Sequence, residues 1–207
     1  DWFVQPLVVN AFYEATGNAV IFPVGILRTP IFNPDRPKYL NYGMLGVVIG
    51  HEITHGFDNS GRKFDKVGNL TQWWSDDIVD KFKEQAACFV EQYSQLPIDI
   101  VGQNVNGNQT LDDNICDNSG LKQAYRAYKN YVSKYGEEPS LPGISYSNLQ
   151  VFFLQYAQWN FELRHACDHQ PLRRCRTAYT PPARASAAVR AASRTALCWR
   201  CPRIKLA

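Results

Sequence analysis

The stretch that decides the fold reads Gly50-His51-Glu52-Ile53-Thr54-His55-Gly56-Phe57-Asp58. Two histidines four residues apart lie on the same face of a helix, so both imidazoles reach a single metal ion. Glu52 follows the first histidine and is placed to contact a water on that ion rather than the ion itself. The stretch therefore predicts half of a zinc site together with its general base.

A hydrolytic zinc site needs a third protein ligand and an open position for water. Asp113 is the leading candidate, because it begins a predicted helix and Asp117 lies one turn further on the same face. One carboxylate can ligate zinc while the other accepts a hydrogen bond from a ligand imidazole and sets its tautomer. Asp112 is a weaker alternative, since adjacent helical positions point roughly 100° apart. Acidic residues here also have a simpler explanation, because they complement the helix dipole.

The hydrophobic pattern predicts an α+β fold that is predominantly helical, with a small N-terminal β portion. Strands are expected over residues 8–13 and around 21–23. Helices are expected over residues 42–58, 76–93, 112–135 and 149–160. The first contains Gly43, Gly46 and Gly50, which form a smooth face for close packing. The second has a predicted buried stripe of Ile78, Phe82, Ala86, Phe89 and Tyr93. The third is expected in two segments, interrupted at Gly120.

Charge divides the chain into two parts. From residue 163 onward there are nine arginines and one lysine against one aspartate, which gives +9. The whole chain carries +3, so the preceding 162 residues carry −6. We therefore expect one domain over residues 1–160 and a basic tail over 161–207, disordered or produced by a shifted reading frame. Binding of the tail to nucleic acid or a membrane surface is a further alternative, but we expect no nucleic-acid partner.

Short sequence motifs indicate the cellular location of the protein. The sequons Asn69-Leu70-Thr71 and Asn108-Gln109-Thr110 are typical of a secreted glycoprotein. No apolar stretch approaches the roughly 18 residues that span a bilayer. The first residue is Asp1, which suggests a fragment or a processed product. We expect an extracellular or cell-surface protein, whose parent is either secreted or anchored through a segment absent here.

Taken together, these motifs resemble the neprilysin and endothelin-converting-enzyme family of zinc metallopeptidases. The resemblance covers nearly all of residues 1 to about 158. Besides the stretch from His51 to Asp58, it is carried by Val9-Asn10-Ala11-Phe12-Tyr13, Phe22-Pro23-Val24-Gly25-Ile26-Leu27, Leu40-Asn41-Tyr42-Gly43, Gly61-Arg62-Lys63-Phe64-Asp65, Gly68-Asn69-Leu70 with Trp73-Trp74, and Thr110-Leu111 through Leu121-Lys122-Gln123-Ala124-Tyr125-Arg126-Ala127-Tyr128. It implies a thermolysin-like catalytic domain that binds one zinc ion and hydrolyses peptides.

The resemblance also implies a role for each matching residue. His51 and His55 become zinc ligands, Glu52 the catalytic base, and Asp117 the group that orients His51. Asp58 matches a position that supports the active-site network. Asn10 and Ala11 match an edge strand that hydrogen-bonds the substrate backbone.

Several departures from the family pattern bear on activity. The family has glutamate as third ligand where this chain has Asp113, which is one methylene shorter. Direct ligation is therefore expected to need a backbone shift or an intervening water. Cys116 replaces a small residue, and Cys88 is expected to lack its usual partner. The family's C-terminal histidine and arginine, which bind the oxyanion and the substrate carboxylate, have no match, because the neighbours of His165 and His169 differ.

Two functional hypotheses follow. The leading hypothesis is a zinc-dependent endopeptidase, in which Glu52 takes a proton from a zinc-bound water and passes it to the leaving amine. The alternative is a catalytically impaired fragment or pseudoenzyme that retains only peptide or metal binding.

Overall fold

The computed structural model of the chain describes residues 3–98 and 102–168, with side chains as far as residue 158. The basic tail beyond residue 168, including His169, therefore lies outside the described residues, and so does the side chain of His165. The helical elements are α1 (Lys38–Asn41), a π-helical turn (Tyr42–Gly46), α2 (Val47–His55), α3 (Asp76–Ser94), α4 (Leu111–Tyr135) and α5 (Asn148–Asp168). Short 3₁₀ turns occupy Val24–Ile26 and Gly61–Lys63.

The strands are short and form two separate hairpins. β1 (Phe12–Glu14) pairs antiparallel with β2 (Ala19–Ile21), and Tyr13 lies opposite Val20. β3 (Pro97–Ile98) pairs antiparallel with β4 (Gln103–Asn104). The predicted predominantly helical α+β fold is confirmed. The strand predicted over residues 8–13 was placed too early, and Val8 and Val9 are exposed ahead of β1.

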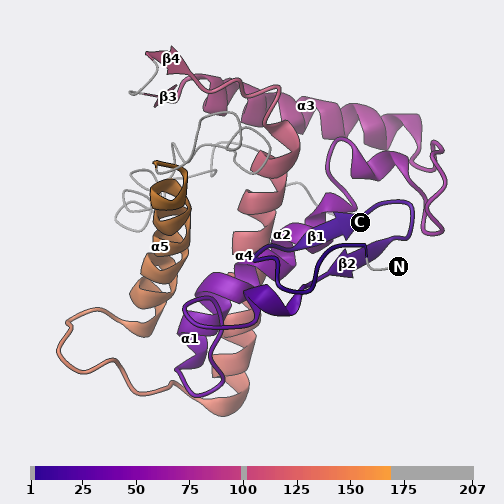
Figure 1. The fold of residues 1–207 in the computed structure, drawn as a ribbon. Helices are drawn as coiled ribbons and strands as arrows, with labels where there is room; N and C mark the ends of the chain where they lie inside the picture. The colour runs from indigo at the N-terminus through magenta and orange to yellow at the C-terminus, as the bar shows by residue number, and fades with distance from the viewer. Residues whose placement is uncertain (1–2, 99–101, 169–207) are drawn as a thin grey trace.

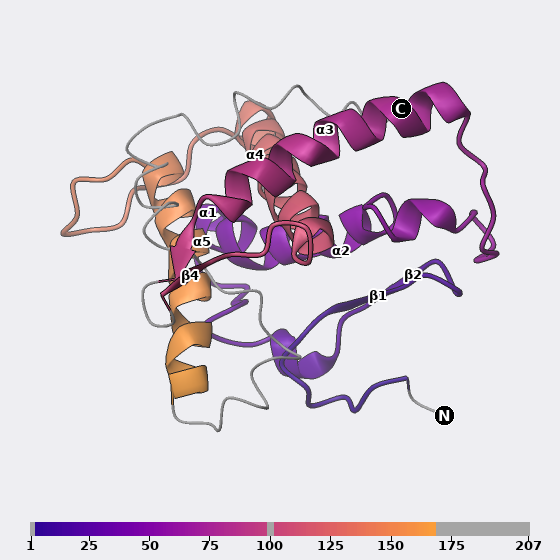
Figure 2. The same cartoon turned by 90° about the horizontal axis from the view of Figure 1, so that it is seen from above.

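Helix α4 is the central element of the molecule. α3 crosses one end of it, α5 lies on one side, and α2 with the β1–β2 hairpin lies on the other (Figures 1 and 2). α2 packs along α4, and the helical turns before α2 pack against α5. The apolar core has three clusters. They lie between α3 and the start of α4, between α1, α4 and α5, and between the N-terminal segment and the π-helical turn.

Close packing of the π-helical turn and α2 depends on two of the three glycines in the predicted smooth face, Gly43 and Gly50, whereas Gly46 leaves ordinary space for a Cβ atom. A Cβ atom on Gly50 would lie only 2.8 Å from the Cα atom of Gly120 on α4, and a Cβ atom on Gly43 would collide with the carbonyl of Phe152 on α5. The prediction that α4 breaks at Gly120 was wrong, since the helix is continuous. Glycine disfavours a helix by about 1 kcal/mol relative to alanine, but here its lack of a side chain allows the helix crossing.

The buried face of α3 differs from its prediction at one position. Phe82, Ala86, Phe89 and Tyr93 are buried as expected, whereas Ile78 is 42% exposed and Val79 is buried instead. Both positions lie within one turn of Phe82, so periodicity alone did not separate them.

Two further expectations are corrected. α5 continues to Asp168 rather than ending near residue 160. Cys88 is disulfide-bonded, and Cys116 is the free cysteine among the residues whose side chains are described.

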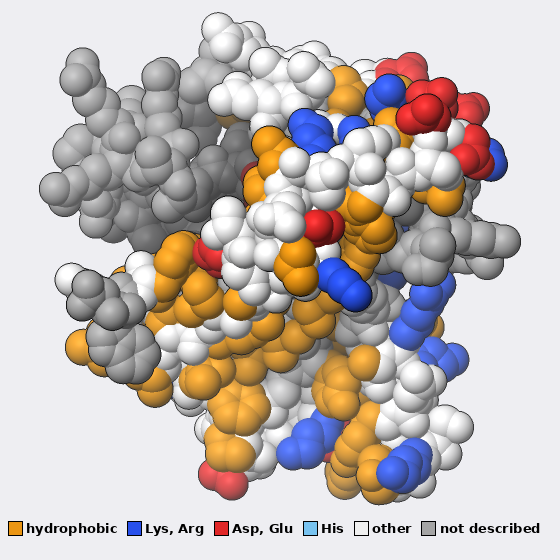
Figure 3. Space-filling view, turned by 90° about the vertical axis from the view of Figure 1, so that its right-hand side faces the viewer, with side chains coloured by type: hydrophobic (Ala, Val, Ile, Leu, Met, Phe, Trp, Pro, Cys, Tyr) orange, Lys and Arg blue, Asp and Glu red, His pale blue; other side chains and the backbone are white. Residues whose placement is uncertain are grey.

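The surface exposes many large apolar side chains. Figure 3 shows one face on which hydrophobic side chains form a broad area, with lysine and arginine side chains at its edges. None of the described helices combines the length and the apolar character of a membrane-spanning segment.

Candidate metal centre

Helix α2 presents His51 and His55 side by side. Their ring centroids lie 4.7 Å apart with the planes nearly perpendicular. The side chain of Thr54 donates a hydrogen bond to the Gly50 carbonyl, and Gln123 of α4 donates to the Thr54 hydroxyl at 3.0 Å. The bond from Gln123, together with the close approach of Gly50 to Gly120, holds α2 against α4.

Each imidazole is oriented by a carboxylate behind it. The Nδ1 atom of His51 lies 2.8 Å from an Asp117 oxygen, and the Nδ1 atom of His55 lies 2.6 Å from an Asp58 oxygen. An ionised carboxylate only accepts hydrogen bonds, so Nδ1 carries the proton in both rings. The lone pair of each neutral ring then lies on Nε2, which is the arrangement that metal-ligating histidines show.

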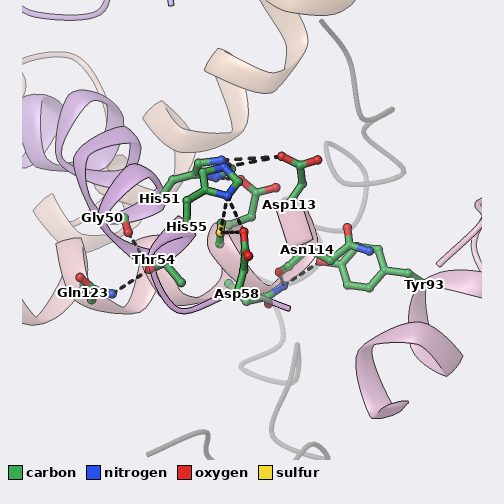
Figure 4. A network of polar contacts seen from close by, with 12 residues as sticks. Gly50, His51, Thr54, His55, Asp58, Tyr93, Asp113, Asn114 and Gln123 are labelled. Carbon is green, nitrogen blue, oxygen red and sulfur yellow. Dashed lines mark hydrogen bonds and ion pairs between the residues drawn. The ribbon is translucent and has the colours of Figure 1, made fainter. Parts of the chain in front are cut away.

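Asp113 approaches the two rings from the first turn of α4 (Figure 4). Its Oδ1 atom lies 3.8 Å from Nε2 of His51 and 4.0 Å from Nε2 of His55. Two ligand bonds of about 2.0–2.2 Å each allow donor atoms on one zinc ion to lie up to roughly 4.0–4.4 Å apart. Both distances fit a shared ion. Two imidazole lone pairs and a carboxylate form a donor set that suits zinc.

Glu52 lies between the two histidines in sequence and is 6% exposed. Burial raises the pKa of its carboxyl group, the nearby His51 and His55 oppose this rise, and the Asp113 carboxylate adds to it. A carboxyl group with a raised pKa is better suited to both accept and return a proton near neutral pH.

The carboxylate of Asp58 organises the turn after α2. One oxygen accepts hydrogen bonds from the backbone N–H groups of Ser60 and Gly61, at 2.9 and 2.7 Å, while the other contacts His55. Asp58 is 2% exposed, and removing its carboxylate would leave the buried Gly61 N–H group without an acceptor.

We therefore expect Asp58→Ala to lower the free energy of unfolding by about 1–3 kcal/mol, because the buried Gly61 N–H group is left unsatisfied. Chemical denaturation of the metal-free chain measures this loss. Asp65→Ala is the matched control, because Asp65 accepts two backbone hydrogen bonds in a similar turn, from Val67 and Asn69, but is more exposed to water. Equal losses in the two variants would contradict the structural role of Asp58.

Asn10 and Ala11 lie just before β1 rather than within it. The side chain of Asn10 accepts a hydrogen bond from the Ala11 N–H group at 2.9 Å, so this group is engaged locally. β1 itself lies beside the end of α2, where the Tyr13 hydroxyl group approaches Gly56. No recorded contact among the described residues joins Asn10 or Ala11 to the histidines, and their substrate-binding role stays a prediction.

The sequence did not indicate the role of Cys116, which lies behind His55. Its sulfur is fully buried, 3.2 Å from Nδ1 of His55 and 3.7 Å from Asp58. His51, His55 and Cys116 also form a possible metal-binding group. Burial first and the neighbouring Asp58 and Asp113 carboxylates next raise the pKa of the thiol. The sulfur lies at Nδ1 of His55, on the side of the ring that faces Asp58, whereas Asp113 lies near the Nε2 atoms of both rings. Asp113 is therefore the candidate third donor on the side of the free imidazole lone pairs.

Asp112 turns away from the histidines. One of its carboxylate oxygens accepts a hydrogen bond of 2.6 Å from the hydroxyl of Ser60, in the turn after α2. This contact was not foreseen, since nothing in the sequence pairs two residues so far apart. For Cys116, the sequence did contain a signal. It lies three residues after Asp113, and positions with this spacing share a helix face, so the thiol could have been expected near the site.

Comparison with known proteins places this site in a family. Residues 10–202 match Peptidase family M13. The chain is 51% identical over 159 residues to neprilysin of Oryctolagus cuniculus and 52% identical over 158 residues to endothelin-converting enzyme 1 of Homo sapiens. Each alignment covers 76% of this chain, but 21% and 20% of the relatives. The chain belongs to peptidase family M13, which confirms the resemblance inferred from its motifs.

Solved structures agree with this assignment. Zinc metalloprotease ZMP1 of Mycobacterium tuberculosis, in complex with an inhibitor, matches with a TM-score of 0.72 at 38% identity. That match covers 77% of this chain and 25% of the other. PepO from Lactobacillus rhamnosis matches with a TM-score of 0.64 at 32% identity, over 77% of this chain and 23% of the other. The chain thus spans about one fifth of the length of the curated relatives it matches.

Proposed function

We propose that residues 1–160 form the zinc-binding part of a metallopeptidase catalytic domain, which hydrolyses peptide bonds of oligopeptides with one zinc ion per chain. The observation that carries this proposal is the convergence of three donor atoms from two helices. The Asp113 oxygen lies 3.8 and 4.0 Å from the Nε2 atoms of His51 and His55, within the reach of one ion. Membership of peptidase family M13 supports the same reaction class.

His51, His55 and Asp113 would hold the ion, while Asp117 and Asp58 keep the imidazoles in the ligating tautomer. Bound zinc supplies Lewis-acid polarisation of a water molecule and of the substrate carbonyl. Glu52 accepts a proton from the attacking water at its carboxylate and returns it to the leaving amine. Burial of Glu52 favours this exchange, because it disfavours the charged form of the carboxyl group.

A peptide substrate would lie along the β1 side of the site, with its backbone paired to the segment at Asn10 and Ala11. An unpaired strand edge provides such pairing through main-chain hydrogen bonds. The hydrogen bond between Asn10 and the Ala11 N–H group would have to open for the substrate to use that group. We further propose an extracellular or cell-surface location, supported by the disulfide-bonded Cys88 and by the exposed Asn69 and Asn108 of the two sequons.

One experiment tests the function directly. Native mass spectrometry of the chain should show one zinc ion per polypeptide, and a fluorogenic oligopeptide should be hydrolysed in a reaction that a chelator stops and added zinc restores. Cleavage that continues after removal of all metal would contradict the proposal.

The second candidate, an impaired fragment that only binds metal or peptide, is favoured by two observations. The Asp113 side chain is 41% exposed, and the Ala11 N–H group is already engaged. Stoichiometric zinc without turnover would select this candidate, and a chain without zinc binding would contradict both.

A further inference from the structure

Asp113 has few contacts to hold it in place. Among the described residues, its recorded polar contacts are those with His51 and His55. Its side chain is short and 41% exposed, so its position depends on the backbone of the first turn of α4. Whatever fixes that turn relative to α2 also fixes the third donor of the proposed site.

A continuous path of hydrogen bonds links the first turn of α4 to the imidazole of His55. The His55 ring contacts Asp58, Asp58 accepts from the Ser60 N–H group, and the Ser60 hydroxyl donates to Asp112 at 2.6 Å. Asp112 precedes Asp113 in the chain. The path therefore starts at one proposed zinc ligand and ends at the residue beside another.

The burial of the Asp112 side chain gives a second indication that its contact with Ser60 matters. Its second carboxylate oxygen is buried and has no hydrogen-bond partner among the described residues. Leaving a buried acceptor without a hydrogen bond is unfavourable. The hydrogen bond from Ser60 therefore offsets the cost of keeping the Asp112 side chain in this position. Asp117 and Cys116 contact the histidines further along α4, and Leu111 packs the first turn against α3. The Ser60–Asp112 bond instead joins the first turn to the segment after α2.

We infer that Ser60 and Asp112 are a positioning pair, which holds the first turn of α4 where the short Asp113 side chain reaches the ion. The inference rests on the proposed zinc site. The positioning pair should therefore matter more for zinc binding through aspartate at position 113 than for zinc binding through glutamate. Glutamate has one more rotatable bond, so it can still reach the ion when the turn is displaced.

The test is a double-mutant cycle on the full chain, with zinc affinity measured by competition against a chromophoric chelator. Removing a group that supports a ligand typically weakens metal binding by about 10–100-fold, and we expect Ser60→Ala to lie near tenfold because it acts through Asp112. In the Asp113→Glu background the same change should have less than about a third of this effect. Ser75→Ala is the matched control, since Ser75 donates to Asp77 at the start of α3, far from the histidines in sequence.

The possible outcomes distinguish the positioning pair from the zinc site itself. Zinc binding that Ser60→Ala leaves unchanged, or weakens equally in both backgrounds, overturns the positioning pair and leaves the zinc site standing. Absence of zinc binding by the unmodified chain overturns the zinc site and the pair together. Unfolding of the metal-free variants is measured in parallel, because a merely structural role would lower stability without dependence on residue 113.

Discussion

Glu52→Gln is expected to lower peptide-bond hydrolysis by about 10²–10⁴-fold, the usual contribution of a general acid–base group. Glutamine has nearly the same shape but cannot accept the proton of the attacking water. Zinc stoichiometry should not change, because the three proposed donor atoms are untouched. The measurement is kcat for a fluorogenic oligopeptide, alongside zinc content by native mass spectrometry.

A folding defect would not account for such a loss. Burial raises the pKa of Glu52, so ionisation of its carboxyl group is less favourable in the folded metal-free chain than in the unfolded chain, and a neutral amide avoids this cost. The variant should therefore be at least as stable as the parent before zinc is added. Glu84→Gln makes the same chemical change on the exposed face of α3 and serves as the control. Full turnover in Glu52→Gln would contradict the proposed mechanism.

Gly120→Ala is expected to have the largest effect on the fold. A Cβ atom at this position would lie 2.6 Å from the backbone nitrogen of His51 and 2.8 Å from the carbonyl oxygen of Val47. Backbone atoms cannot relieve the overlap by a side-chain rotation, so α2 and α4 must move apart. Overpacking of this kind typically costs about 1–3 kcal/mol. Because Asp113 and Asp117 move with α4, we also expect weaker zinc binding.

The same substitution at Gly46 provides a control on the neighbouring turn. There a Cβ atom would meet its nearest neighbours, on Asn41, Tyr42 and Ala124, at 3.6–3.7 Å, which is ordinary contact. Gly46→Ala should be neutral or should stabilise the chain by up to about 1 kcal/mol, since alanine favours the helix. Chemical denaturation and chelator competition measure both variants. Equal stability and equal zinc affinity in the two would contradict the role of the glycine crossing.

Local patterns accounted for most of the helices and for the placement of His51 and His55 on one face of α2. Apolar periodicity predicted α3 nearly to its ends, but it did not distinguish Val79 from Ile78, since both lie one turn from Phe82. The sequence pattern also predicted an interruption of α4 at Gly120, where the helix is continuous. Helix propensity does not include the packing of a second helix against that glycine.

The sequence by itself determined the shared face of His51 and His55, because a spacing of four residues is local helix geometry. It also indicated Asp113 and Asp117 as partners one turn apart. Only the tertiary structure decided that the Asp113 carboxylate reaches both imidazoles, that Asp117 and Asp58 lie behind them, and that Ser60 holds Asp112. Most of these contacts join residues 50 or more positions apart. They depend on how α2 crosses α4, and that crossing is set by the close approach of two glycine backbones.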